Sequence, residues 1–67
     1  MIEIVVNGDV RRVPEGQTLT GLLQELELDP ERVAIEMNRK IVKQPDWSGT
    51  VLGPGNRVEI VQFVGGG

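Results

Sequence analysis

One leucine stripe limits what this chain can fold into, because it supplies a single amphipathic helix. Leucines recur at positions i, i+3, i+4 and i+7 from Leu19 to Leu26, and Thr18 is a candidate N-cap. Asp29-Pro30 disfavours helical backbone, so the pattern predicts a helix over residues 19–27. The chain has 67 residues, enough for one hydrophobic core, and one stripe covers one face of one sheet.

Short runs of β-branched residues on both sides of the helix predict the strands of that sheet. Asn7-Gly8 is a strong hairpin signal, because both positions tolerate positive φ. The predicted strands cover residues 2–6, 9–13, 33–37, 41–42 and 57–64, with residues 45–48 as a loop or single helical turn. A ferredoxin-like sheet needs a second helix, which the sequence does not offer. We expect an α+β chain with a β-grasp, or ubiquitin-like, arrangement: one domain over residues 1–64, with a mixed sheet and one main helix on one face.

The residue types present exclude most kinds of chemistry within the chain. Cysteine and histidine are absent, which removes disulfides, thiolate nucleophiles, Cys/His metal sites and imidazole catalysis. The acidic residues near the helix end lack the spacing of a calcium-binding loop, and we interpret them as a solvated face: Glu25, Glu27, Asp29 and Glu31. We therefore expect no enzyme activity, and no metal or cofactor bound by this chain.

Charge and hydropathy narrow the range of partners. Ten acidic residues against seven basic ones give a net charge of −3, and the basic pairs Arg11-Arg12 and Arg39-Lys40 have no aromatic residues between them. Binding to nucleic acid is therefore not expected. The N-terminal sequence has no basic leader, and no apolar run is long enough to span a bilayer. We expect a cytoplasmic protein that is monomeric when free and does not associate with membranes.

The last predicted strand carries apolar side chains on both faces. Alternation along residues 58–63 places Val61 and Phe63 on the face that the helix does not cover, and Val5 of the first strand falls on that face too. We interpret Val5, Val61 and Phe63 as contacts for a partner protein. The alternative is that these side chains pack beneath the loop that contains Trp47, with the indole as a shield.

Three glycines, Gly65-Gly66-Gly67, follow the last predicted strand, and we expect a flexible tail over residues 65–67. Glycine has no side chain, so such a thread can enter a narrow channel in another protein. A carboxylate on Gly67 is ionised at neutral pH and is a nucleophile toward an activated phosphate. An inert, frayed tail is the alternative.

Several stretches spread over nearly the whole chain match one known family. They are the opening strand with Asn7-Gly8, Glu15-Gly16-Gln17-Thr18-Leu19 with Leu22-Leu23, Ala34-Ile35-Glu36-Met37-Asn38, Ile41-Val42, Trp47, Gly55-Asn56-Arg57-Val58-Glu59-Ile60-Val61 and Val64-Gly65-Gly66-Gly67. With these stretches the chain resembles the ThiS-type sulfur carriers of thiamine biosynthesis, which are prokaryotic ubiquitin-like proteins. Arg39-Lys40 replaces a Gly-Glu-like turn common in that family, and Phe63 replaces a smaller residue. Neither difference touches the terminal chemistry.

The resemblance implies a carrier whose catalytic groups belong to its partners. A ubiquitin-activating-like adenylating enzyme would use ATP and magnesium to convert the Gly67 carboxylate to an acyl-adenylate, with Gly65 and Gly66 in its active site. A persulfide from a cysteine desulfurase or related donor would then give a thiocarboxylate on Gly67. Thiazole synthase would accept that sulfur. The chain itself would be a protein co-substrate and not an enzyme.

Other functions remain open from the sequence. The nearest alternative is a sulfur carrier for molybdopterin synthesis or tRNA thiolation, since those carriers also end in Gly-Gly. A ubiquitin-like protein modifier would instead join Gly67 to a lysine. A β-grasp interaction domain with an inert tail is a third possibility, and an autonomous enzyme ranks last.

Overall fold

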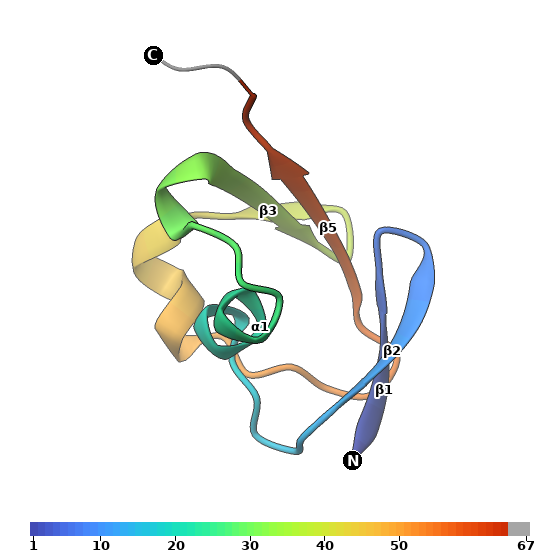
Figure 1. Cartoon of the computed structure of the whole chain (residues 1–67). Coiled ribbons are helices and arrows are strands. Elements are labelled where there is room, and N and C mark those ends of the chain that lie inside the picture. The colour runs from blue at the N-terminus through green and yellow to red at the C-terminus, as the bar shows by residue number, and fades with distance from the viewer. Residues whose placement is uncertain (65–67) are drawn as a thin grey trace.

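Five strands form one mixed sheet in the order β2-β1-β5-β3-β4 in the computed structural model, which describes residues 1–64 (Figure 1). The strands are β1 (Ile2–Val6), β2 (Asp9–Val13), β3 (Val33–Met37), β4 (Lys40–Val42) and β5 (Arg57–Gln62). Neighbouring strands pair antiparallel except for β1 and β5, which run parallel at the centre of the sheet. The mixed α+β fold with a β-grasp arrangement is confirmed.

The β1–β2 hairpin turns at Asn7-Gly8, as the sequence predicts. Both residues have positive φ, 50° for Asn7 and 86° for Gly8, which matches the right-handed twist of the two strands. The β3–β4 hairpin has the same kind of tip. There Asn38 and Arg39 have φ of 52° and 70°, although arginine is seldom found in this left-handed region.

The main helix, α1 (Leu19–Glu25), is shorter than the predicted 19–27. Its first turn is capped as expected, because the Thr18 hydroxyl accepts a hydrogen bond from the Gly21 amide at 3.1 Å. At its other end the Leu28 amide donates to the Leu23 carbonyl at 2.9 Å, and Glu27 adopts a φ of 58°. This left-handed closure ends the helix and folds Leu28 back against the core.

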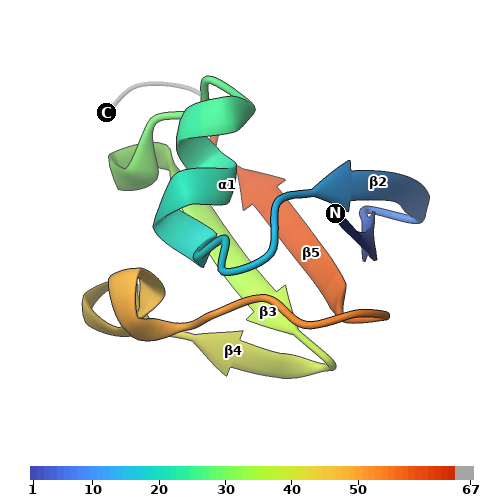
Figure 2. The same cartoon turned by 90° about the horizontal axis from the view of Figure 1, so that it is seen from below.

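Helix α1 lies over one face of the sheet (Figure 2), and the hydrophobic core fills the space between them. Its buried members come from every part of the chain: Ile4, Val13, Leu19, Leu22, Leu23, Val33, Ile35, Trp47, Leu52, Val58 and Ile60. Trp47 sits in the short 3-10 helix Gln44–Gly49, which packs against α1. Its indole Nε1 donates to the Val42 carbonyl at 2.7 Å, so this side chain anchors the loop to the core.

The Asn7 side chain continues the contact between β1 and β5 beyond their last paired residues. The paired residues end at Val6 and Val58, after which β1 turns away. The Asn7 Oδ1 atom then accepts from the Ile60 amide at 2.7 Å, and its Nδ2 donates to the Ile60 carbonyl at 3.2 Å. A side-chain amide thus replaces the backbone of the strand that has left the sheet.

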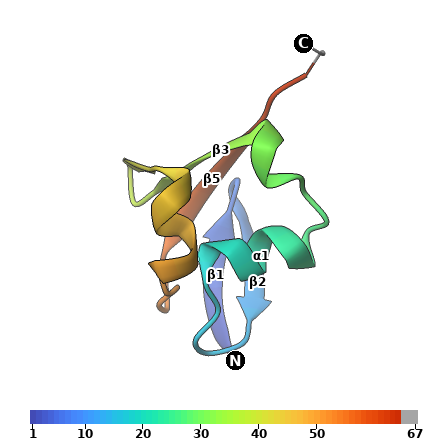
Figure 3. The ribbon, with the colours of Figure 1, turned by 90° about the vertical axis from the view of Figure 1, so that its left-hand side faces the viewer.

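The last strand ends at Gln62, so the predicted strand over 57–64 was too long. The last backbone hydrogen bond near the end of the strand is made by Phe63, whose amide donates to the Arg32 carbonyl at 2.7 Å. Arg32 belongs to the short 3-10 helix Pro30–Arg32, which comes before the first residue of β3. Val64 therefore has no residue of β3 to pair with. Strand β5 runs toward the end of the molecule opposite the N-terminus (Figure 3).

We call the two hydrogen bonds between the Asn7 side chain and Ile60 the Asn7 clamp. Replacing Asn7 tests how much this clamp stabilises the sheet. Asn7→Gly preserves the positive φ but removes both hydrogen bonds to Ile60, and should lower the free energy of unfolding by about 1–2 kcal/mol in urea titrations. Asn7→Asp should also destabilise, because it turns one carboxylate oxygen toward the Ile60 carbonyl. Asn38→Gly at the other hairpin tip is the control, since it removes one exposed hydrogen bond from Arg57. Equal stability of all three variants and the wild type would show that the clamp contributes nothing.

Candidate functional site

The outer face of the sheet, opposite α1, carries exposed apolar side chains near the end of β5. Val58 and Ile60 are buried toward α1, whereas Val61 is 59% exposed and Phe63 is 56% exposed. The alternative in which Trp47 shields these two side chains is wrong, because Trp47 packs into the core beside α1. Val61 and Phe63 therefore lie where a partner can reach them.

Two further apolar residues extend this surface, and the sequence analysis did not select them. Ala34 of β3 lies directly opposite Val61, and Ile41 of β4 is 75% exposed. The signal was present in the alternation of β4, where Val42 packs against the core and Ile41 must then point outward. We call the set Ala34, Ile41, Val61 and Phe63 the outer patch.

Two carboxylates border the outer patch. Glu36 of β3 and Glu59 of β5 are directly opposite each other in the antiparallel register, and both are exposed. A shallow hollow lies between these carboxylates, Val61 and Ile41. Like charges facing each other across two strands do not stabilise a sheet, so this pair adds negative potential beside the patch without helping the fold.

Val5 does not belong to the outer patch. It pairs with Arg57 at the start of β5 and is half-buried. At about 3.3 Å per residue, the four positions from Arg57 to Val61 separate the two sites by roughly 13 Å. The parallel register therefore divides the predicted group of Val5, Val61 and Phe63 into two places.

The chain leaves the sheet beside the outer patch. Val64 is 97% exposed, and the Phe63 amide makes the last backbone hydrogen bond toward the C-terminus within residues 1–64. The predicted tail residues Gly65, Gly66 and Gly67 lie outside the described residues. The outer patch and the exit of the chain thus occupy one end of the molecule.

The acidic residues around the end of α1 make surface contacts. The Glu25 carboxylate accepts a hydrogen bond from the Gln17 side chain at 3.1 Å and lies 3.7 Å from the Arg11 guanidinium. Asp29 caps the following turn by accepting from the Glu31 amide at 2.9 Å. Residues 1–64 contain no group of three or more acidic side chains close enough to hold a metal ion. The helices in that range are also too short and too polar to cross a bilayer.

Comparison with known proteins gives consistent matches over nearly all of the chain. The family model described as the ThiS family matches residues 4–67. A thiazole synthase of Magnetococcus marinus is 38% identical over 66 residues, and one of Paramagnetospirillum magneticum is 36% identical. The match covers 98% of this chain but 20% of each synthase, so the chain spans about a fifth of the length of these relatives.

Smaller relatives match from end to end. The sulfur carrier protein ThiS of Escherichia coli is 26% identical, with 98% of this chain and 100% of that protein covered. The crystal structure of the thiamine biosynthesis protein ThiS from Geobacter metallireducens superposes with a TM-score of 0.84 at 30% identity, over 98% of this chain and 100% of the other. The family model, the sequence relatives and the fold agree, and the chain belongs to the ThiS family.

Proposed function

We propose that this chain is a sulfur carrier of thiamine biosynthesis that holds sulfur as a thiocarboxylate on Gly67. The observation that carries the proposal is the family match, which runs to residue 67 and so includes all three glycines. The structure adds that Val64, the residue before them, is almost fully exposed. A partner can therefore approach the point where the tail begins.

The chemistry requires two steps, both performed by partner enzymes. An adenylating enzyme of the ubiquitin-activating kind binds ATP and magnesium, and the Gly67 carboxylate attacks the α-phosphate with loss of pyrophosphate. A persulfide supplied through a cysteine desulfurase or a related donor then displaces AMP from the acyl-adenylate. A second thiol of the donor then attacks the resulting acyl disulfide, which releases the thiocarboxylate on Gly67 and leaves the donor sulfurs joined as a disulfide. This division of labour suits a chain without cysteine or histidine, because the sulfur is carried on a main-chain carboxyl group.

Thiazole synthase is the acceptor that the relatives favour. In two thiazole synthases, a segment similar to this chain makes up a fifth of the protein. Joining a segment like this chain to a thiazole synthase in one polypeptide suits a sulfur carrier and an acceptor enzyme that act in succession. We infer that this chain delivers its sulfur to a thiazole synthase, and that molybdopterin synthesis and tRNA thiolation are the less favoured destinations.

The outer patch is the proposed docking surface for the adenylating enzyme. It combines exposed apolar area with the exit of the chain at one end of the molecule, so an enzyme that binds the patch also receives the tail. Val5, at the other end of β5, would be reached only by a partner that spans the length of the strand.

The intact mass of the protein tests the proposal directly. After incubation with its adenylating enzyme, ATP and a persulfide donor, we expect a gain equal to the exchange of one oxygen for one sulfur, mapped to Gly67. Removing Gly67 should abolish the gain. Conjugates to lysine side chains would support the protein-modifier alternative instead, and an unchanged mass would favour an interaction domain with an inert tail.

A bulky side chain at position 66 should block activation without affecting the fold. Gly66→Val places a β-branched side chain where the tail must pass a narrow channel, and should lower the rate of ATP-dependent activation by roughly 100-fold or more. Gly66→Ala should give an intermediate loss, and both variants should melt at the wild-type temperature. Normal activation of the valine variant would contradict the narrow-channel model.

A charge on the outer patch should weaken docking more than it lowers stability. Phe63→Asp should raise the Kd for the adenylating enzyme about tenfold, since exposed aromatic side chains are frequent anchors of interfaces. Val51→Asp is the matched control, because Val51 is 59% exposed but lies beside Thr18, away from the outer patch. If the folded Phe63→Asp and Val51→Asp variants bind equally well, the patch is not the docking surface.

A further inference from the structure

Strand β5 continues beyond the end of its parallel neighbour and leaves a free edge. The Ile60 amide and carbonyl face β1 and are taken by Asn7, while the Phe63 amide faces the other way, toward Arg32. Backbone groups alternate along a strand, so the Gln62 amide and carbonyl face the side of β1. β1 has already turned away there, and neither group has a hydrogen-bond partner within residues 1–64.

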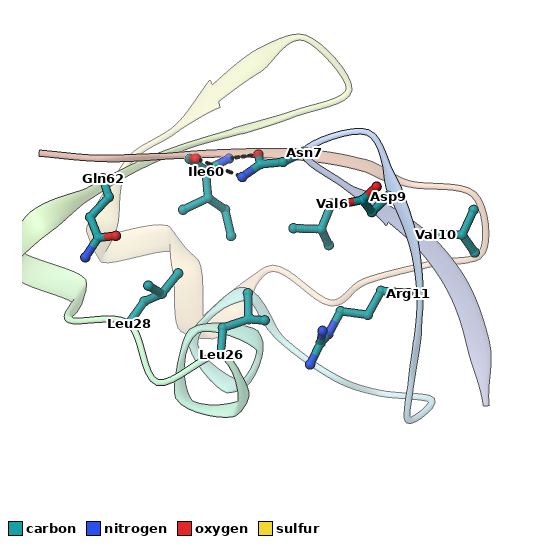
Figure 4. Close-up of a pocket in the computed structure, with 9 residues that line it drawn as sticks. All are labelled: Val6, Asn7, Asp9, Val10, Arg11, Leu26, Leu28, Ile60 and Gln62. Atoms are coloured by element: carbon teal, nitrogen blue, oxygen red, sulfur yellow. Dashed lines mark hydrogen bonds between the residues drawn. The ribbon is translucent and has the colours of Figure 1, made fainter.

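A cleft with one apolar side and one polar side adjoins this free edge. Its apolar side chains include Val6, Leu26, Leu28 and Ile60, and its polar ones are Asn7, Asp9, Arg11 and Gln62. Gln62 stands at the end where the chain leaves the sheet (Figure 4). Its volume is about 380 Å³, and Figure 4 shows Leu26 and Leu28 facing Ile60 across the hollow. Val6, Leu26 and Leu28 are half-buried, so they already contact the core from one side.

The end of α1 builds one wall of the cleft. The left-handed Glu27 and the hydrogen bond from the Leu28 amide to the Leu23 carbonyl hold Leu28 beside Leu26. On the opposite rim, the Arg11 Nε atom is buried and has no hydrogen-bond partner among the described residues. The cleft thus offers apolar side chains along one wall and a free strand edge at its mouth.

We propose that an extended segment of the adenylating enzyme adds to the sheet beside Gln62 and places one apolar side chain in this cleft. The inference rests on the function proposed above and names how the partner holds the chain. An extended peptide is the ligand that suits a free strand edge, because it supplies a carbonyl for the Gln62 amide and an amide for the Gln62 carbonyl.

The cleft lies beside the start of the C-terminal tail, which favours the adenylating enzyme as the partner that binds it. Gln62 is followed by Phe63 and Val64 and then by the three glycines, so whatever encloses the tail must surround this end of β5. A segment paired at Gln62 would run alongside the chain as it leaves the sheet and hold it extended. The outer patch lies on the opposite face of the same strand, so the enzyme would contact β5 from both sides.

Proline at position 62 tests the strand pairing. Proline has no amide hydrogen, and on this side of β5 the amide is not used by the fold. Gln62→Pro should therefore keep the wild-type melting temperature but raise the KM for the carrier in ATP-dependent adenylation roughly tenfold. Gln62→Ala, which keeps the amide and loses only the side chain, is the matched control and should change the KM less than about twofold.

Hydrogen exchange of the wild-type protein tests the strand pairing at Gln62 independently of how the proline variant folds. In the free chain the Gln62 amide should exchange faster than that of Phe63, which is bonded to Arg32. In complex with the adenylating enzyme, the Gln62 amide should become protected. An unprotected amide in a complex that still adenylates Gly67 would overturn the strand pairing alone. Failure of the wild type to be adenylated would overturn the proposed function, and this assignment with it.

Discussion

The parallel pairing of β1 with β5 holds the two halves of the molecule together. The β1–β2 hairpin is local, and β3, β4 and β5 form a second antiparallel group. Within residues 1–64, the pairing of β1 with β5 is what joins these groups in the sheet, and their paired residues are few. We call the junction of β1 and β5 the seam. Asn7 strengthens it with two hydrogen bonds to Ile60, which is 53 positions away, and the Gly55 amide donates another to the Glu3 carbonyl at 2.8 Å. The core beneath α1 depends on this seam, because Ile4 and Val58 stand on its two sides.

Local patterns predicted most of the elements. The leucine stripe located α1, and Asn7-Gly8 located the first hairpin, because both depend on neighbours within a few residues. The end of α1 was harder to predict. Glu27 has no intrinsic preference for positive φ, and it adopts that conformation because Leu28 is drawn back to the core. A local propensity that tertiary packing overrides cannot be found from a stretch of sequence alone.

The candidate site shows the same limit. Alternation correctly placed Val61 and Phe63 on the outer face, but it does not give the register between strands. Without the pairing of Val5 with Arg57, there was no reason to separate Val5 from the other two. Ile41 was missed because the alternation in its three-residue strand becomes informative only once Val42 is known to pack against the core. The clamp made by Asn7 could not be predicted either, since Asn7-Gly8 is fully explained by its turn.

The central place of β5 in the sheet also affects when the outer patch and the cleft form during folding. This strand is the fifth of the sheet in chain order and pairs with the first, so the sheet lacks its middle until the residues of β5 are available. Contacts between such distant parts of a sequence form late and slowly in folding. The outer patch and the cleft both need β5 in place, so a nascent or unfolded chain presents neither surface. An enzyme that recognises these surfaces would act only on chains that have finished folding.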